Sequence, residues 1–153
     1  MTSTHALQSV EELTKPGGAL DLGRDPARLL VHVIRLLAQR GGPLPGQEVD
    51  RELVELGLDH QTARQFLEQW TERNDDGDVV ALGVTYNPTP HRMIVGDARM
   101  WAWCAMDTLI FAIVLDQRVA VESTSPAPGE TVRLRVDPYG TLQTEPADAV
   151  VPD

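Results

Sequence analysis

The chain has 153 residues, of which 42% are hydrophobic and 24% are charged, and its formal net charge is −10 at pH 7. A chain of this length buries roughly two-thirds of its unfolded surface, which is enough for a hydrophobic core. The acidic balance disfavours nucleic acid and anionic membranes as partners, and a single cysteine excludes an internal disulfide. We therefore expect a cytoplasmic protein that binds neither nucleic acid nor membrane.

Three helices with short glycine-bearing links are predicted after a polar N-terminal arm. Asp25-Pro26 has an N-cap residue followed by a proline suited to the first helical position, and Gly41-Gly42 ends that helix;. A second helix is expected between Pro45 and Gly57, and a third, capped by Asp59, is expected over residues 61–73. This succession resembles a helix-turn-helix module.

A hairpin is predicted next, with strands over 79–85 and 91–95 joined by a turn at Asn87-Pro-Thr-Pro90;. Such a hairpin would be the wing of a winged helix. The third helix carries Arg64 and Arg73 among acidic residues, which is not the basic face that DNA recognition requires;. We therefore expect this module to pack against the rest of the chain.

The run from Met100 to Phe111 holds the only cysteine of the chain and two of its three tryptophans. We predict a helix over 98–115 with Asp97 as its N-cap, which would place Cys104 and Asp107 side by side at positions i and i+3. Two interpretations remain open from spacing alone. Cys104 is either a small buried hydrophobe beside a paired carboxyl, or part of a reactive site.

The segment Trp101-Ala-Trp-Cys104-Ala-Met-Asp107-Thr-Leu-Ile-Phe111 resembles the active-site helix of the organomercurial (alkylmercury) lyases, which carry Ala-Trp-Cys-Ala-Leu-Asp-Thr-Leu there. Residues 76–85, 118–123 and 129–136 resemble strands that flank this helix in the family. The resemblance covers roughly residues 25–151, and the helix motif is its most specific part.

The resemblance implies protonolysis of a carbon–mercury bond. Cys104 matches the first of two cysteines that bind mercury, and Asp107 matches the aspartate that donates the proton. Trp101 and Trp103 are candidates for an indole lining around the organic group. Mercury would be substrate and product, and no tightly bound cofactor is implied.

The chain departs from the family in its cysteines. The second catalytic cysteine lies beyond the equivalent of Val150-Val151-Pro152, and the sequence ends at Asp153 with no other cysteine. We therefore expect a family member shortened at the C-terminus, and three functions stay open. The chain could be a lyase that takes a second thiol from an external thiol, a partner chain or another copy. It could bind mercury without turnover, or serve another reaction or a protein–protein role.

The expected fold is α+β, a three-helix winged-helix-like module packed on a small mixed α/β unit with antiparallel strands. We divide the chain into a flexible arm (1–24), the winged-helix-like domain (25–95) and an alkylmercury-lyase-like catalytic domain (96–153). The last contains strands near 119–123, 131–136 and 141–144. No ligand spacing links the four histidines, which are His5, His32, His60 and His91;.

Overall fold

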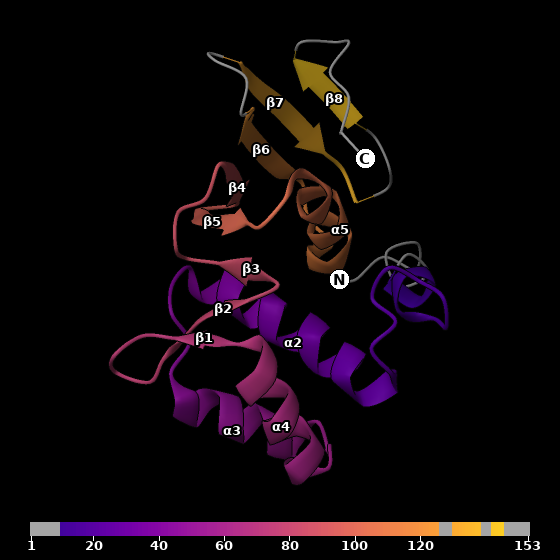
Figure 1. The fold of residues 1–153 in the computed structure, drawn as a ribbon, viewed down its shortest axis with the longest axis vertical. Coiled ribbons are helices and arrows are strands. Elements are labelled where there is room, and N and C mark those ends of the chain that lie inside the picture. The colour runs from indigo at the N-terminus through magenta and orange to yellow at the C-terminus, as the bar shows by residue number, and fades with distance from the viewer. Residues whose placement is uncertain (1–9, 126–129, 139–141, 146–153) are drawn as a thin grey trace.

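The computed structural model describes residues 10–125, 130–138 and 142–145. The rest of the predicted arm and the predicted C-terminal tail lie outside these residues. Helices and one antiparallel sheet make up the described chain, so the predicted α+β class is confirmed (Figure 1). The elements are α2 (Arg24–Arg40), α3 (Gly46–Glu55), α4 (His60–Trp70), β1 (Glu72–Arg73), β2 (Val79–Leu82), β3 (Val84–Thr85), β4 (His91–Val95), β5 (Ala98–Ala102), α5 (Ala105–Leu115), β6 (Val119–Thr124), β7 (Thr131–Val136) and β8 (Leu142–Glu145).

The three N-terminal helices follow the sequence prediction closely. Gly23 and not Asp25 is the N-cap of α2, and Asp25 instead lies in the first helical turn, where a carboxylate favours the positive end of the helix;. Asp59 caps α4 as predicted, because its Oδ2 accepts a hydrogen bond from the Thr62 amide at 3.0 Å. That bond holds the pKa of Asp59 below its ordinary value;. His32 lies half-buried on α2 with Nε2 2.5 Å from Glu52 on α3, in keeping with a boundary residue.

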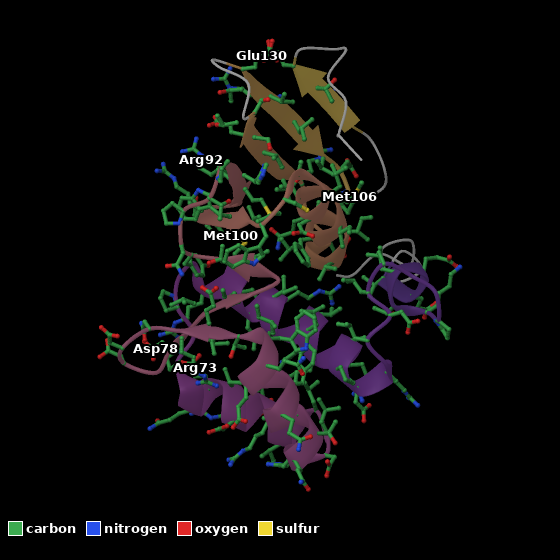
Figure 2. The ribbon with its side chains drawn as sticks, in the orientation of Figure 1. Arg73, Asp78, Arg92, Met100, Met106 and Glu130 are labelled. Atoms are coloured by element: carbon green, nitrogen blue, oxygen red, sulfur yellow. The ribbon has the colours of Figure 1, made fainter. Side chains whose placement is uncertain are left out.

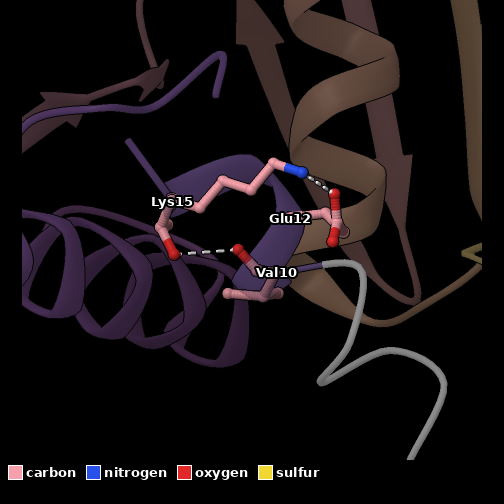
Figure 3. A network of polar contacts seen from close by, with 4 residues as sticks. Val10, Glu12 and Lys15 are labelled. Atoms are coloured by element: carbon pink, nitrogen blue, oxygen red, sulfur yellow. Dashed lines mark hydrogen bonds and ion pairs between the residues drawn. The ribbon is translucent and has the colours of Figure 1, made fainter. Parts of the chain in front are cut away.

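The segment before α2 packs on the core. Residues 10–14 are helical, the Thr14 hydroxyl donates to the Val10 carbonyl at 3.0 Å, and Lys15 forms an ion pair with Glu12 (Figure 3). Leu13 and its apolar neighbours Leu20 and Leu22 contact the hydrophobic core. The flexibility that the sequence predicts for residues 1–24 stays a prediction.

The sheet has the strand order β1-β2-β3-β5-β4-β6-β7-β8, and each of its pairings is antiparallel. The predicted hairpin of 79–85 with 91–95 is wrong, because β4 pairs with β5 and β6. Gly83, with a φ of 72°, turns the chain so that β2 pairs directly with β3. Strand β3, which the prediction paired with residues 91–95, is instead hydrogen-bonded to β5.

The predicted helix over 98–115 begins seven residues later, at Ala105. Its first part is β5, in which buried and more exposed side chains alternate from Ala98 to Ala102. A short apolar run fits a buried helix and a central strand equally well by periodicity. Here the backbone groups of β5 are used by β3 on one side and β4 on the other, which fixes the strand. Asp97 accordingly lies before β5 and does not cap a helix.

Helices α2 and α5 pack against each other and both contact the sheet, α2 at β2 and β5 and α5 at β4, β5 and β6. Helices α3 and α4 lie on the side of α2 away from α5 (Figure 1). One hydrophobic cluster joins α2, α5 and the sheet through residues such as Ile34, Met100 and Phe111. The boundary at 95/96 falls in the turn between two paired strands, and the division into domains stays a prediction. Among the described residues, none of the helices combines the length and apolar character that a bilayer crossing needs.

Candidate active site around Cys104

The thiol of Cys104 is placed at the point where β5 gives way to α5. Cys104 is the N-cap residue of α5, with an extended backbone (φ −143°, ψ 168°), and its Sγ accepts a hydrogen bond from the Asp107 amide at 3.4 Å. The structure therefore brings Sγ of Cys104 to the main-chain amide of Asp107, and the predicted position of the Asp107 carboxyl beside the thiol stays a prediction. An N-cap side chain folds back over the first turn to meet the amide three residues on, so capping brings the two residues together.

Asp107 occupies the third position of α5 and is half-buried. A carboxyl in a first turn benefits from the positive end of the helix dipole. The buried hydroxyl of Thr108 donates to the Ala105 carbonyl at 2.6 Å and closes that turn. The first turn of α5 thus holds a thiol and a carboxyl on a packed framework.

Cys104 is an exposed free cysteine. The alternative that it is a buried core residue is therefore wrong. Its neighbour Trp103 is 51% exposed and Met106, labelled in Figure 2, is 48% exposed, so two exposed apolar side chains flank Cys104 in the sequence. Exposed apolar groups around a reactive atom suit an organic ligand.

The two tryptophans lie in different surroundings. Trp103 directly precedes the thiol, whereas Trp101 belongs to β5 and pairs with Thr85 and Arg92. Because side chains alternate along a strand, Trp101 faces away from the buried Ala102 side that α5 covers;. The structure therefore brings Trp103 beside Cys104 and places Trp101 on the opposite face of the sheet. That either indole contacts a substrate stays a prediction.

Two polar residues that the sequence did not single out meet at the same end of the sheet. His91 opposes Ala102 of β5 on one side and Ser123 of β6 on the other. Its Nδ1 is hydrogen-bonded to the Ser123 hydroxyl, and Ser123 is 8% exposed. The two residues are 32 positions apart. Their contact follows from the register between β4 and β6, and the spacing of residues along the sequence does not indicate that register.

In the part of the chain that the structure describes, no group of three or more histidine, cysteine, aspartate or glutamate side chains forms a metal cage. A ligand at this site would accordingly be held by few protein donors. The described site is one exposed thiol at the start of α5, a half-buried aspartate three residues on, and two exposed apolar side chains close to them in the sequence.

Comparisons with known proteins show similarity over the segment that holds Cys104 and Asp107. The model of the alkylmercury lyase family matches residues 84–152, which include Cys104 and Asp107. An alkylmercury lyase of Staphylococcus epidermidis is 35% identical over 121 residues, covering 78% of this chain and 54% of the relative. One from Pseudomonas putida is 34% identical over 137 residues, covering 87% of this chain and 63% of the relative. The chain belongs to the alkylmercury lyase family.

The fold of this alkylmercury lyase family member is also that of a solved relative. The crystal structure of the mercury-bound form of MerB2 superposes with a TM-score of 0.63 at 21% identity, covering 99% of this chain and 74% of that one. The chain spans between about half and two-thirds of the two curated relatives, 54% and 63% of their lengths.

Proposed function

We propose that this chain cleaves the carbon–mercury bond of organomercurial compounds by protonolysis, with Cys104 binding mercury and Asp107 donating the proton. The observation that carries the proposal is the exposed Cys104 thiol held against the amide of Asp107 in the first turn of α5. Membership of the alkylmercury lyase family supports the substrate class.

The chemistry follows from the two side chains. Thiolate is a soft ligand and suits mercury. As the sulfur–mercury bond forms, the thiol proton passes to solvent and the exchangeable anion of the organomercurial leaves. The Asp107 amide and the positive end of α5 favour negative charge on sulfur while the proton leaves and mercury binds;. The Asp107 carboxyl takes up a proton from solvent, transfers it to the mercury-bound carbon and is left as a carboxylate. The electron pair of the carbon–mercury bond becomes the new carbon–hydrogen bond, and mercury stays on sulfur.

Release of mercury needs a further donor. We propose that an external thiol, or a thiol from a partner chain or a second copy, takes mercury from Cys104. Trp103, exposed beside the thiol, would contact the organic group. Trp101 would contribute from the far face of the sheet only through its packing. A cytoplasmic setting, where free thiols are kept reduced, suits this exchange.

A second candidate is an organomercurial-binding protein without turnover. It is favoured by one observation: the chain carries a single cysteine, so it supplies one thiolate. In that case Cys104 would retain about one equivalent of organomercurial with its organic group intact.

The experiment that separates the two incubates the protein with phenylmercury chloride in excess thiol, and measures benzene by gas chromatography and protein-bound mercury by mass spectrometry. An enzyme releases benzene over many turnovers, whereas a binding protein keeps the phenylmercury adduct. Asp107→Asn should keep the adduct and lose turnover by about 10²–10⁴-fold, the usual contribution of a positioned acid.

The matched control is Asp97→Asn, which changes an exposed aspartate in the turn before β5 and should leave turnover unchanged. Turnover that survives Asp107→Asn would remove the proton-donor role. A Cys104→Ser protein that still binds phenylmercury would overturn the proposed function as a whole.

A further inference from the structure

The His91–Ser123 pair lies at the end of β5 from which the chain continues to Cys104, and it has no role in the chemistry above. His91, Ala102 and Ser123 are aligned across β4, β5 and β6, so their side chains share one face of the sheet;. It is the face that carries the buried Met93, Met100 and Val121 and that α5 covers. Cys104, two residues beyond Ala102, opens that helix.

Hydrogen bonds of Thr89, two residues before β4, connect the start of β4 to the end of β5. The Thr89 hydroxyl donates to the Ala102 carbonyl at 2.5 Å and accepts from the His91 amide at 3.1 Å. Diagonal neighbours in an antiparallel pair lie roughly 7–8 Å apart between Cα atoms, within reach of aromatic side chains. Cys104 comes two residues after Ala102, the last residue of β5 that pairs with β4, and its own backbone is extended. A strand continued in that direction would place Cys104 diagonally from His91, at a separation that one shared ligand atom would bridge.

The hydrogen bond of His91 is the kind that prepares an imidazole to bind a metal. A ligating histidine generally donates one ring N–H to an oxygen nearby, which fixes the tautomer and leaves the lone pair of the other nitrogen free. Nδ1 of His91 is bonded to the Ser123 hydroxyl. Among the described residues, no hydrogen bond to Nε2 accompanies it. An imidazole nitrogen is softer than a carboxylate oxygen and is a suitable donor for late metals.

We propose that Nε2 of His91 is the second protein donor to mercury held by Cys104. This rests on the proposed function of Cys104. In the first step the Cys104 sulfur–mercury bond forms, the thiol proton passes to solvent, and the exchangeable anion of the organomercurial leaves. Nε2 then gives its lone pair to mercury, and no further bond breaks and no redox change occurs. The added donor raises electron density on mercury and hence on the carbon that accepts the proton. The chain thereby supplies a second donor without a second cysteine.

The test measures how firmly mercury is retained. Wild-type protein and variants are loaded with one equivalent of phenylmercury chloride, or separately of inorganic Hg(II), and titrated with a competing monothiol. His91→Gln should weaken retention by at least tenfold. Ser123→Ala, which removes only the partner of Nδ1, should weaken it by about tenfold, the low end of the effect of outer-shell partners. The control is His60→Gln, at an exposed histidine on α4, and should change nothing.

Spectroscopy of the wild-type protein keeps the proposal testable even if a His91 variant does not fold. X-ray absorption at the mercury edge should show one sulfur and one nitrogen neighbour from the protein. In ¹⁵N-histidine spectra, mercury should shift Nε2 of a single residue, His91. Retention unchanged in His91→Gln, or sulfur without nitrogen at mercury, overturns the inference. The proposed function fails separately, through loss of mercury dependence on Cys104.

Discussion

Arg35 on α2 donates from its Nε to the main-chain carbonyl of Val114, 2.8 Å away in the last turn of α5. The last carbonyls of a helix have no partner within the helix, and a cation there also favours the negative end of the dipole. One end of α5 is therefore fixed by α2, while its other end carries Cys104. The orientation of the reactive turn thus depends on a residue of the N-terminal helices.

Replacing Arg35 with methionine should lower the free energy of unfolding by about 1.5–3 kcal/mol, the range for a hydrogen bond to a charged group. Urea unfolding followed by circular dichroism is the measurement. Arg40→Met is the matched control on the same helix. Arg40 forms an ion pair with Glu48, and the two side chains are 43% and 39% exposed, respectively. Exposed ion pairs contribute about 0–1 kcal/mol to the free energy of unfolding. Equal losses in the two variants would contradict the role assigned to Arg35.

Cys104→Ser should abolish mercury binding without destabilising the fold. Serine is among the preferred N-cap residues, and its oxygen is a stronger acceptor for the Asp107 amide than sulfur;. We expect an unfolding free energy equal to that of wild type or higher by up to about 1 kcal/mol, and a lower one for Cys104→Ala by a similar amount. Thermal unfolding of the three proteins compares them. An alanine variant as stable as the serine variant would show that the cap contributes nothing.

The sequence predicted the outline of the fold because its helix boundaries carry strong local signals. Asp59, for example, caps α4 as expected. Ala98–Ala102 was assigned to a helix because this short segment runs directly into the apolar residues of α5, and periodicity alone does not separate a short apolar run of strand from helix;.

The motif around Cys104 and Asp107 is local, so sequence comparison found it, although the capping geometry that joins the two was not foreseen. The contact of His91 with Ser123 depends on the register of β4 and β6 and was missed. Register is set by the packing of whole strands, and no short pattern in the sequence encodes it.

Position 83 requires glycine for two reasons, its left-handed backbone conformation and the lack of room for a Cβ atom. Its φ is 72°, and a Cβ there would lie 2.9 Å from Cζ of Phe111 on α5. Gly83→Ala should therefore cost a backbone term of about 1–2 kcal/mol and a further packing term of about 1–3 kcal/mol. Gly77→Ala is the matched control, since its φ is 82° but a Cβ meets nothing within 4 Å. Chemical denaturation should show the larger loss at Gly83, and equal losses would exclude a clash with Phe111.

Tyr86 predicts an alkaline limit to stability. Its hydroxyl donates to the Leu37 carbonyl at 2.5 Å, and burial raises its pKa from 10.0 to about 12. The folded state thus binds this proton more tightly than the unfolded state. Its contribution is fully present below pH 10, the ordinary pKa of tyrosine, and is lost as the pH rises towards about 12;. In Tyr86→Phe that loss should disappear, at a cost of about 1 kcal/mol near neutral pH. Denaturation at pH 8 to 11.5 checks this, and parallel pH profiles for the two proteins would refute it.

Strands β4 and β5 stand in the sheet in the reverse of their order in the chain, and this arrangement affects how the start of α5 is positioned. β5 must enter between β3 and β4, while the outer edge of β4 pairs with β6 from beyond α5. The hairpin of β4 and β5 can form early, because its contacts are local, but closing it against β3 and β6 carries a loop-closure cost. Until that closure, the strand that leads into α5 lacks its neighbour β3, and β4 lacks β6. The position of Cys104 relative to the rest of the sheet is therefore set only when these long-range pairings have formed.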